Sequence, residues 1–221
     1  YLYPAKKPGD KVGRLVNFVD LAPTLLSIAG IPAPGYMQGK AFLGRFRTKE
    51  PLYVFMSRLR MDERYDMVRA VRDKQYRYIH NYMPFRITLQ HLDYLFTAPS
   101  ALSWETLFLE GKTDELSGRY FRTKPVEELY DTENDPWEIY NLAGDPAYRK
   151  VLKRMREAEN KWRKEVRDVG LIPETDYEDF MGEKSMYDYM RSPGCPLEEL
   201  LHVSGLATSG NPKDLGAFTG F

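Results

Sequence analysis

The sequence predicts an α+β fold in which a small antiparallel β-sheet packs against a long C-terminal helix. Three observations predict it: a short apolar helix at residues 20–29, short strands between residues 52 and 82, and a long amphipathic helix at residues 146–169. A helix followed by a group of strands and then by another helix is the order of an α+β protein, because a parallel sheet needs strands and helices that alternate.

The composition indicates a folded chain with no bias towards nucleic acid or membranes. The 221 residues suffice for one large or two small domains, and 43% of them are hydrophobic. Lys+Arg and Asp+Glu both number 32, so no overall field attracts a polyanion. No apolar run approaches the roughly 20 residues that span a bilayer. Cys195 is the sole cysteine, which excludes an internal disulfide. We expect neither a nucleic-acid partner nor a membrane partner.

The early helix is predicted from its ends. Asp20 can serve as the N-cap, and Pro23 is tolerated in the first turn. Gly30 fits the left-handed position after the last turn, and Pro32 follows it. A mostly apolar helix of about ten residues must be buried against something larger. Its apolar face is expected to consist of Leu21, Leu25, Leu26 and Ile28.

The middle of the chain predicts antiparallel strands. Leu52–Met56 is a short apolar run, and Met67–Arg72 and Gln75–Tyr82 flank Asp73-Lys74 as a hairpin with a two-residue turn would. On the second hairpin strand, Tyr76, Tyr78 and His80 share one face, and Arg77, Ile79 and Asn81 share the other. Arg69 and Arg72 lie on opposite faces of the first, so one of them is expected to point inwards and to need a partner.

The second half predicts one more strand and the long helix. Residues 83–127 are irregular with helical pieces, Glu128–Tyr130 is a strand, and Asp131–Pro136 is an Asx/Pro turn. Asp145 and Pro146 begin the long helix, which Gly170 is expected to end. Its Lys, Arg and Glu residues predict a solvated face. After residue 183 we expect an extended tail. The apolar stripe of the helix consists of Tyr148, Val151, Leu152, Met155, Ala158, Trp162, Val166 and Val169.

A search for catalytic motifs finds little. The three histidines have no metal-ligand spacing around them, and no phosphate loop or nucleophile elbow occurs. Asp131–Glu138 resembles a calcium loop but has Pro136 at the glycine position, so a hydrogen-bonded turn is favoured. The arginine-rich segment Ser57–Arg64 is the best functional candidate, because arginine binds sulfate, phosphate or carboxylate through paired hydrogen bonds. The alternative is a solvated loop whose arginines pair with its own acids.

Three segments together resemble one family. The stretch from Val16 to Gly44 resembles the segment that follows the catalytic core of type I sulfatases, within the alkaline phosphatase superfamily. Met67–Tyr82 resembles the hairpin of the sulfatase C-terminal subdomain, and Glu128–Pro146 resembles the signature before its terminal helix. The segment after Asn81 is similar to heparan N-sulfatase-like members. The first motif is matched by Val16, Asp20, Pro23, Thr24, Leu25, Ala29, Gly30, Pro32, Gln38 and Gly39.

The resemblance implies how the chain is organised. Residues 1–45 are expected to be the end of an α/β catalytic domain, residues 46–182 the C-terminal subdomain and residues 183–221 the tail. The family uses Ca²⁺ and a formylglycine made from Cys or Ser in a C/S-x-P-x-R motif. Cys195 is followed by Pro-Leu-Glu and does not fit that motif. We therefore expect no catalytic residue and no metal ligand in this chain. Both cofactors should belong to an N-terminal catalytic domain, which is the expected partner.

The expected function is the C-terminal part of a sulfatase that hydrolyses sulfate esters or N-sulfates of a carbohydrate. This segment should contribute to the substrate cleft and be inactive alone. The candidate substrate-binding residues are Arg58, Arg60, Arg64, His80 and Asn81. Two alternatives remain open: a non-catalytic remnant that binds anionic glycans, and a phosphoryl-transfer relative of the same superfamily. The expected localisation is periplasmic or secreted.

Overall fold

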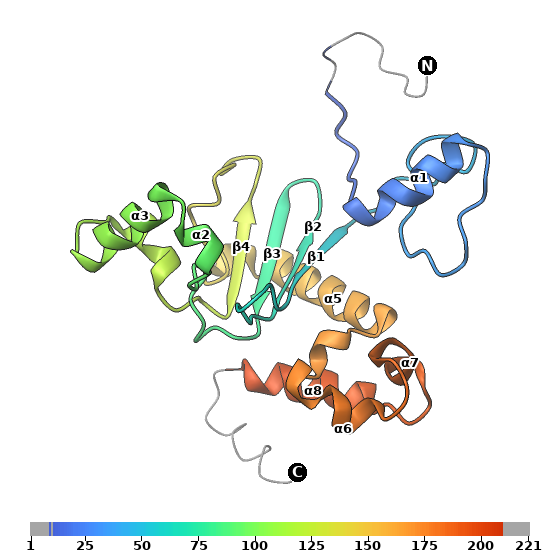
Figure 1. Cartoon of the computed structure of the whole chain (residues 1–221). Coiled ribbons are helices and arrows are strands. Elements are labelled where there is room, and N and C mark those ends of the chain that lie inside the picture. Colours follow the sequence, from blue (N-terminus) through green and yellow to red (C-terminus); the bar gives the residue numbers. More distant parts are fainter. Residues whose placement is uncertain (1–8, 10, 210–221) are drawn as a thin grey trace.

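The computed structural model describes residue 9 and residues 11–209, and Figure 1 shows the arrangement of the helices and strands. The strands are β1 (Val54–Arg58), β2 (Val68–Arg72), β3 (Tyr76–Asn81) and β4 (Glu127–Asp131). The helices are α1 (Leu21–Ile28), α2 (Asp93–Phe96), α3 (Pro99–Leu109), α4 (Glu115–Gly118), α5 (Arg149–Val166), α6 (Tyr177–Met181), α7 (Met186–Arg191) and α8 (Leu197–Ala207). The 3₁₀ turns are η1 (Phe18–Asp20), η2 (Arg119–Phe121), η3 (Pro146–Tyr148), η4 (Val169–Leu171) and η5 (Glu174–Asp176).

The four strands form one antiparallel sheet in the order β1-β2-β3-β4. The predicted hairpin is confirmed, with Val71 opposite Tyr78. Its turn lies one residue later than predicted: the Asp73 amide donates to the Tyr76 carbonyl at 3.0 Å, so Lys74 and Gln75 occupy the two central positions. The carboxylate of Asp73 accepts from the amides of Gln75 and Tyr76, which closes the turn. The α+β class is therefore confirmed.

Helix α5 covers one face of the sheet, and the core lies between them (Figure 1). The sheet contributes Val71, Tyr78 and Leu129, and the helix contributes Leu152 and Met155; all five side chains are buried. The predicted stripe on α5 is therefore the face that packs on the sheet. The predicted cap is also confirmed, because the Asp145 side chain accepts from the Ala147 amide at 2.8 Å.

The end of the long helix differs from the prediction. Helix α5 ends at Val166 rather than near Gly170, because Arg167 adopts a left-handed conformation with φ 55°. The chain leaves the helix there, and Asp168 turns its carboxylate towards the sheet. The prediction of a fully solvated charged face is also wrong at two positions. Glu159 and Arg163 are buried along the apolar stripe, because each has a polar partner on another element.

These residues belong to a buried ion network beneath β2 and β3. Arg69 donates from Nε and Nη2 to the two carboxylate oxygens of Asp168, at 2.9 and 2.7 Å. Arg163 donates from Nε to Asp168 at 3.1 Å. The hydroxyl of Tyr82 donates to Glu159 at 2.9 Å. The expectation that one arginine of β2 points inwards is confirmed for Arg69, which is 1% exposed. The network joins the sheet to the C-terminal end of α5.

The charge balance of this network makes stability depend on pH. Burial by itself raises the pKa of Asp168, but the hydrogen bonds and charge of Arg69 and the charge of Arg163 outweigh it, so this pKa lies below its ordinary value. The carboxylate therefore stabilises the fold above about pH 4, the pKa region of an unfolded aspartate, and this contribution is lost as the pH falls through the lower folded-state pKa.

We expect the wild-type protein to lose more unfolding free energy than the Asp168→Asn variant as the pH falls from about 5 to about 2. The variant has no carboxylate to protonate at this position, so its acid dependence should be shallower. Urea denaturation at a series of pH values measures the two slopes. Equal slopes would show that Asp168 does not couple folding to protonation.

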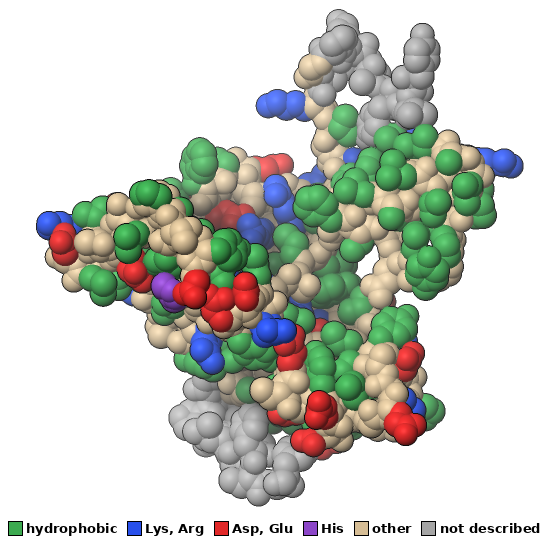
Figure 2. Space-filling model, in the orientation of Figure 1, with side chains coloured by type: hydrophobic (Ala, Val, Ile, Leu, Met, Phe, Trp, Pro, Cys, Tyr) green, Lys and Arg blue, Asp and Glu red, His purple; other side chains and the backbone are tan. Residues whose placement is uncertain are grey.

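Helix α1 has its faces arranged in an unusual way. Thr24 and Ser27 are buried, because their hydroxyls accept from the amides of Phe42 and Phe46 in the loop that folds back over the helix. The predicted apolar face is instead open: Leu25 is 67% exposed, and Phe18, in the preceding turn, is 87% exposed. Figure 2 shows hydrophobic side chains gathered over this lobe.

Two local predictions for α1 change. Asp20 does not cap the helix with its side chain. Asn17 caps the preceding turn instead, and the carboxylate of Asp20 accepts from the amides of Asn17 and Lys40. The close approach of the returning loop explains the glycine of the Gln-Gly pair. A Cβ at Gly39 would lie 1.8 Å from the carbonyl oxygen of Val19, so only glycine fits.

The prediction of an extended tail after residue 183 is wrong for residues 183–209. Helices α7 and α8 form there and pack with the segment after α5 around a second apolar cluster. Its buried members are Ile172, Met186, Met190 and Leu197. Methionine and leucine side chains spaced four residues apart on one short helix explain why α7 packs there. Residues 210–221 lie outside the described part of the chain. The boundaries at residues 45 and 182 stay predictions.

No helix among the described residues is long and apolar enough to cross a membrane.

Candidate functional site

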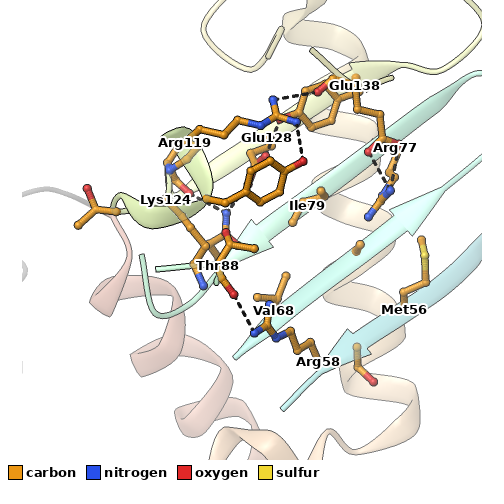
Figure 3. A pocket seen from close by; sticks show the side chains of 17 residues that line it. Met56, Arg58, Val68, Arg77, Ile79, Thr88, Arg119, Lys124, Glu128 and Glu138 are labelled. Atoms are coloured by element: carbon orange, nitrogen blue, oxygen red, sulfur yellow. Dashed lines mark hydrogen bonds and ion pairs between the residues drawn. The ribbon is translucent and has the colours of Figure 1, made fainter. Parts of the chain in front are cut away.

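A cavity of about 470 Å³ lies on the face of the sheet opposite α5. Side chains of all four strands form its floor, and the segment 119–125 together with Thr88 forms its wall. Figure 3 shows the cavity with the strands behind it and charged side chains reaching in from both sides. The charged groups are Arg58, Arg77, Arg119, Lys124, Glu128 and Glu138. Four cations and two carboxylates leave this lining with a positive balance.

Two of the four cations are neutralised by carboxylates. Arg77 Nη1 donates to both carboxylate oxygens of Glu138, at 3.0 and 2.8 Å. Lys124 Nζ contacts both carboxylate oxygens of the buried Asp66, at 2.7 and 2.5 Å. Burial lowers the pKa of Lys124, and the hydrogen bond and charge of Asp66 counteract it only in part. These two cations hold the pocket together.

The other two cations keep most of their donors uncommitted. Arg58 donates from Nη2 to the Thr88 carbonyl at 3.2 Å, and its Nη1 lies 3.8 Å from the carboxylate of Asp66. Arg119 donates to the carbonyl of Glu138 and to the hydroxyl of Tyr120, at 3.2 and 3.3 Å. Its guanidinium also stacks over the Tyr120 ring at 5.2 Å. A guanidinium has five N–H donors, so both groups can bind a further anion.

Glu128 is fixed within the pocket by two donors. The amide of Asn81 donates to its Oε1 at 2.7 Å, and the hydroxyl of Tyr130 donates to its Oε2 at 2.5 Å. Burial, followed by the hydrogen bond to Glu128, raises the pKa of Tyr130, so this hydroxyl stays protonated and acts as a donor. The carboxylate of Glu128 thus has a fixed orientation.

The structure brings two of the five predicted residues together. Arg58 and Asn81 line this pocket, where Asn81 is almost fully buried and orients Glu128. The segment Ser57–Arg64 is not one loop as predicted, because Ser57 and Arg58 complete β1. The rest forms a tight turn in which Met61 bridges to Arg64.

The other three predicted residues lie elsewhere. Arg60 is exposed and pairs with Glu174. Arg64 has two buried guanidinium nitrogens without a hydrogen-bond partner and does not line the pocket. His80 lies on the opposite face of the sheet, where its Nε2 is 3.0 Å from the Thr208 hydroxyl and its ring stacks on Tyr82. These three candidates stay predictions.

Sequence reasoning missed most of the pocket wall. Arg119 and Lys124 come from an irregular segment between α4 and β4, where no periodicity indicates which side chains point inwards. Arg77 could have been found, because it shares a strand face with Ile79 and Asn81. The alternation along β3 was the available signal.

The acidic segment after β4 is a hydrogen-bonded turn, as predicted. The carboxylate of Asp131 accepts from the amides of Glu133 and Asn134, and Asp135 accepts from the amides of Ile139 and Tyr140. Within residue 9 and residues 11–209, no group of three or more His, Cys, Asp or Glu is placed to hold a metal ion. The described residues therefore do not fit a calcium site.

Comparisons with known proteins define the class. A family model described as N-sulphoglucosamine sulphohydrolase, C-terminal, matches residues 1–93. An ulvan-active sulfatase of Formosa agariphila is 41% identical over 164 residues, which cover 74% of this chain and 28% of that protein. The human N-sulphoglucosamine sulphohydrolase is 29% identical over 186 residues, which cover 74% of this chain and 35% of that protein.

A solved structure described as a 2-O GAG sulfatase is 24% identical, with a TM-score of 0.48, and the match covers 86% of this chain and 34% of that chain. The sequence matches place the chain among the hydrolases of sulfated compounds. The chain belongs to the sulfatases and corresponds to their C-terminal portion. It spans about a third or less of the length of the curated relatives that it matches.

Proposed function

We propose that this chain is the C-terminal part of a sulfatase that hydrolyses sulfate esters or N-sulfates of a carbohydrate, and that it contributes one wall of the substrate cleft. The observation that carries this proposal is the pocket on the sheet, where Arg58 lines the cavity with spare guanidinium donors. Arginine suits sulfate, because its planar fork of donors matches the oxygens of the group. The names of the relatives, which include an ulvan-active sulfatase and an N-sulphoglucosamine sulphohydrolase, support a sulfated carbohydrate.

The reacting groups belong, in this proposal, to an N-terminal α/β domain. That domain supplies the formylglycine and the Ca²⁺ ion, for which the described residues offer no ligand cluster. The open apolar surface of α1 supports a partner of this kind: Phe18, Val19 and Leu25 are exposed there. An apolar surface of this type is typical of an interface. The complete protein would be periplasmic or secreted, where sulfated polysaccharides are met.

Of the predicted contact residues, Arg58 is the best placed for the substrate. Asn81 acts through Glu128, which it orients, and it has no exposed surface for a ligand. Arg60, Arg64 and His80 do not line the cavity. We therefore assign Arg58 as the substrate contact and Asn81 as a positioning residue.

Sulfate release tests the proposed function. The complete gene product that contains this chain should release inorganic sulfate from sulfated oligosaccharides, and the 221-residue chain alone should release none. Phosphate esters of the same sugars should be poor substrates. Phosphate release in place of sulfate release would favour a phosphoryl-transfer relative. Binding of sulfated glycans with no turnover of either ester would favour a non-catalytic remnant.

A further inference from the structure

We propose that the pocket on the open face of the sheet binds an anionic oxygen group of a carbohydrate chain through Arg58 and Arg119, with the aromatic residues Trp137 and Tyr140 contacting the sugar rings beside it. The inference rests on the proposed function for the class of ligand, a charged carbohydrate. It assigns residues that the sequence did not indicate. The group bound is a sulfate or a carboxylate, because both present oxygens to a guanidinium in the same way.

The distribution of charge within the pocket singles out these two arginines. Arg77 and Lys124 each contact two carboxylate oxygens, so their charge is neutralised by Glu138 and Asp66. Arg119 has two neutral acceptors and no carboxylate within ion-pair distance. Its pKa is raised, first by the hydrogen bond to Tyr120, so the group stays charged.

Arg58 reaches the same cavity from β1. Its one side-chain hydrogen bond goes to a backbone carbonyl, and its ion pair with Asp66 is long, at 3.8 Å. That carboxylate is already engaged by Lys124 at 2.7 and 2.5 Å, so it does little to neutralise Arg58. Figure 3 shows Arg58 and Arg119 at different sides of the cavity, both over the sheet. An anion in the cavity therefore meets uncommitted donors from two elements.

The wall of the pocket is held in a strained conformation next to two exposed aromatic residues. Glu138 lies in the left-handed region with φ 54°, which is uncommon for a residue other than glycine. Arg77 holds its carboxylate and Arg119 donates to its carbonyl. The neighbours Trp137 and Tyr140 are 81% and 70% exposed. Strained residues of this kind cluster at functional sites, and exposed aromatic rings offer an apolar face to a ligand.

The two kinds of contact give the proposal its ligand class. A cationic pocket alone would accept any small anion, whereas aromatic faces beside it add contact area for a sugar ring. A ligand that carries both features is an acidic oligosaccharide. The arginines are expected to contribute to every anionic ligand, and the aromatic residues only to one that carries sugar rings.

Binding by the complete gene product tests this inference, measured by isothermal titration calorimetry at low and moderate salt. Three probes separate the possible sources of the anion: a sulfated galactan oligosaccharide without carboxylates, an oligogalacturonate without sulfate, and inorganic sulfate. Arg58→Ala and Arg119→Ala should each weaken binding of the preferred oligosaccharide by about tenfold or more, since each removes charge-assisted hydrogen bonds. Arg149→Ala is the charge-matched control, because Arg149 is exposed at the start of α5, on the other face of the sheet.

The aromatic variants complete the design. Trp137→Ala should weaken oligosaccharide binding and leave binding of inorganic sulfate unchanged, and Phe85→Ala, which removes another exposed ring outside the pocket lining, should alter neither. Wild-type affinity in both arginine variants would overturn the inference, and so would an equal loss in Arg149→Ala. Arginine-dependent binding in a protein that releases no sulfate would support the inference while contradicting the proposed function. Circular dichroism and unfolding midpoints equal to wild type establish that each variant is folded.

Discussion

Replacing Asp168 with alanine is expected to lower the unfolding free energy by about 3–5 kcal/mol, the largest effect that we expect of any single substitution in this chain. The variant leaves Arg69 and Arg163 buried without the carboxylate that both contact. Glu159 is too far to replace it, since its Oε1 lies 3.7 Å from Arg163. A buried charge without its partner loses hydration and gains nothing in exchange.

Urea denaturation measures this loss, with Asp179→Ala as the control. Asp179 is exposed on α6, so its removal should change the unfolding free energy by no more than about 0.5 kcal/mol. A loss below about 1 kcal/mol for Asp168→Ala would mean that water or a rearranged side chain replaces the carboxylate, and that the ion network does not hold α5 to the sheet.

The second large effect is expected for Met155→Ala, at about 2–5 kcal/mol. Met155 is fully buried between α5 and the sheet, where it packs with Val71, Tyr78 and Leu129. Removing most of its side chain takes away apolar burial and leaves a cavity that rigid strands cannot close. The measurement is again the unfolding free energy in urea.

Lys153→Ala is the matched control for this substitution. It lies one turn of chain away on the same helix, with 74% of its side chain exposed, and its ion pair with Glu157 is solvated. Its loss should stay within about 0.5 kcal/mol. If both variants lost equal free energy, helix propensity rather than core packing would explain the effect of Met155→Ala.

The fold could be predicted wherever one periodicity dominated. Alternation in β2 and β3 and the spacing of Leu152 and Met155 on α5 indicated which faces meet, and these are the faces that form the core. Glu159 and Arg163 were misjudged because their residue types resemble those of the solvated face. Their partners, Tyr82 and Asp168, are brought to them only by tertiary folding.

The C-terminal helices were missed for a related reason. Helix α7 has six residues, and the segments around it contain proline, glycine and serine. A helix that short shows less than two turns of any pattern. Its Met186 and Met190 become meaningful only when Ile172 and Leu197 close around them. Stability here comes from packing rather than from local propensity.

The candidate site was predictable only in part. Arg58 stood out through the density of arginine between residues 57 and 64, and Asn81 through its strand face. Arg119 and Lys124 lie far from them in the sequence, in a segment without a period, and only the path of residues 119–125 over the sheet brings them together. Local pattern can indicate a strand face, but a wall built by an irregular segment depends on the whole fold.

Sulfate release by the complete gene product tests the central claim most directly. The claim is that this chain is the substrate-contacting C-terminal part of a carbohydrate sulfatase. We expect release from sulfated oligosaccharides by the wild-type protein, a value of kcat/KM lowered about tenfold or more by Arg58→Ala, and an unchanged value for Arg149→Ala. No sulfate release from any sulfated carbohydrate, or release that is unaffected by Arg58→Ala, would contradict the account.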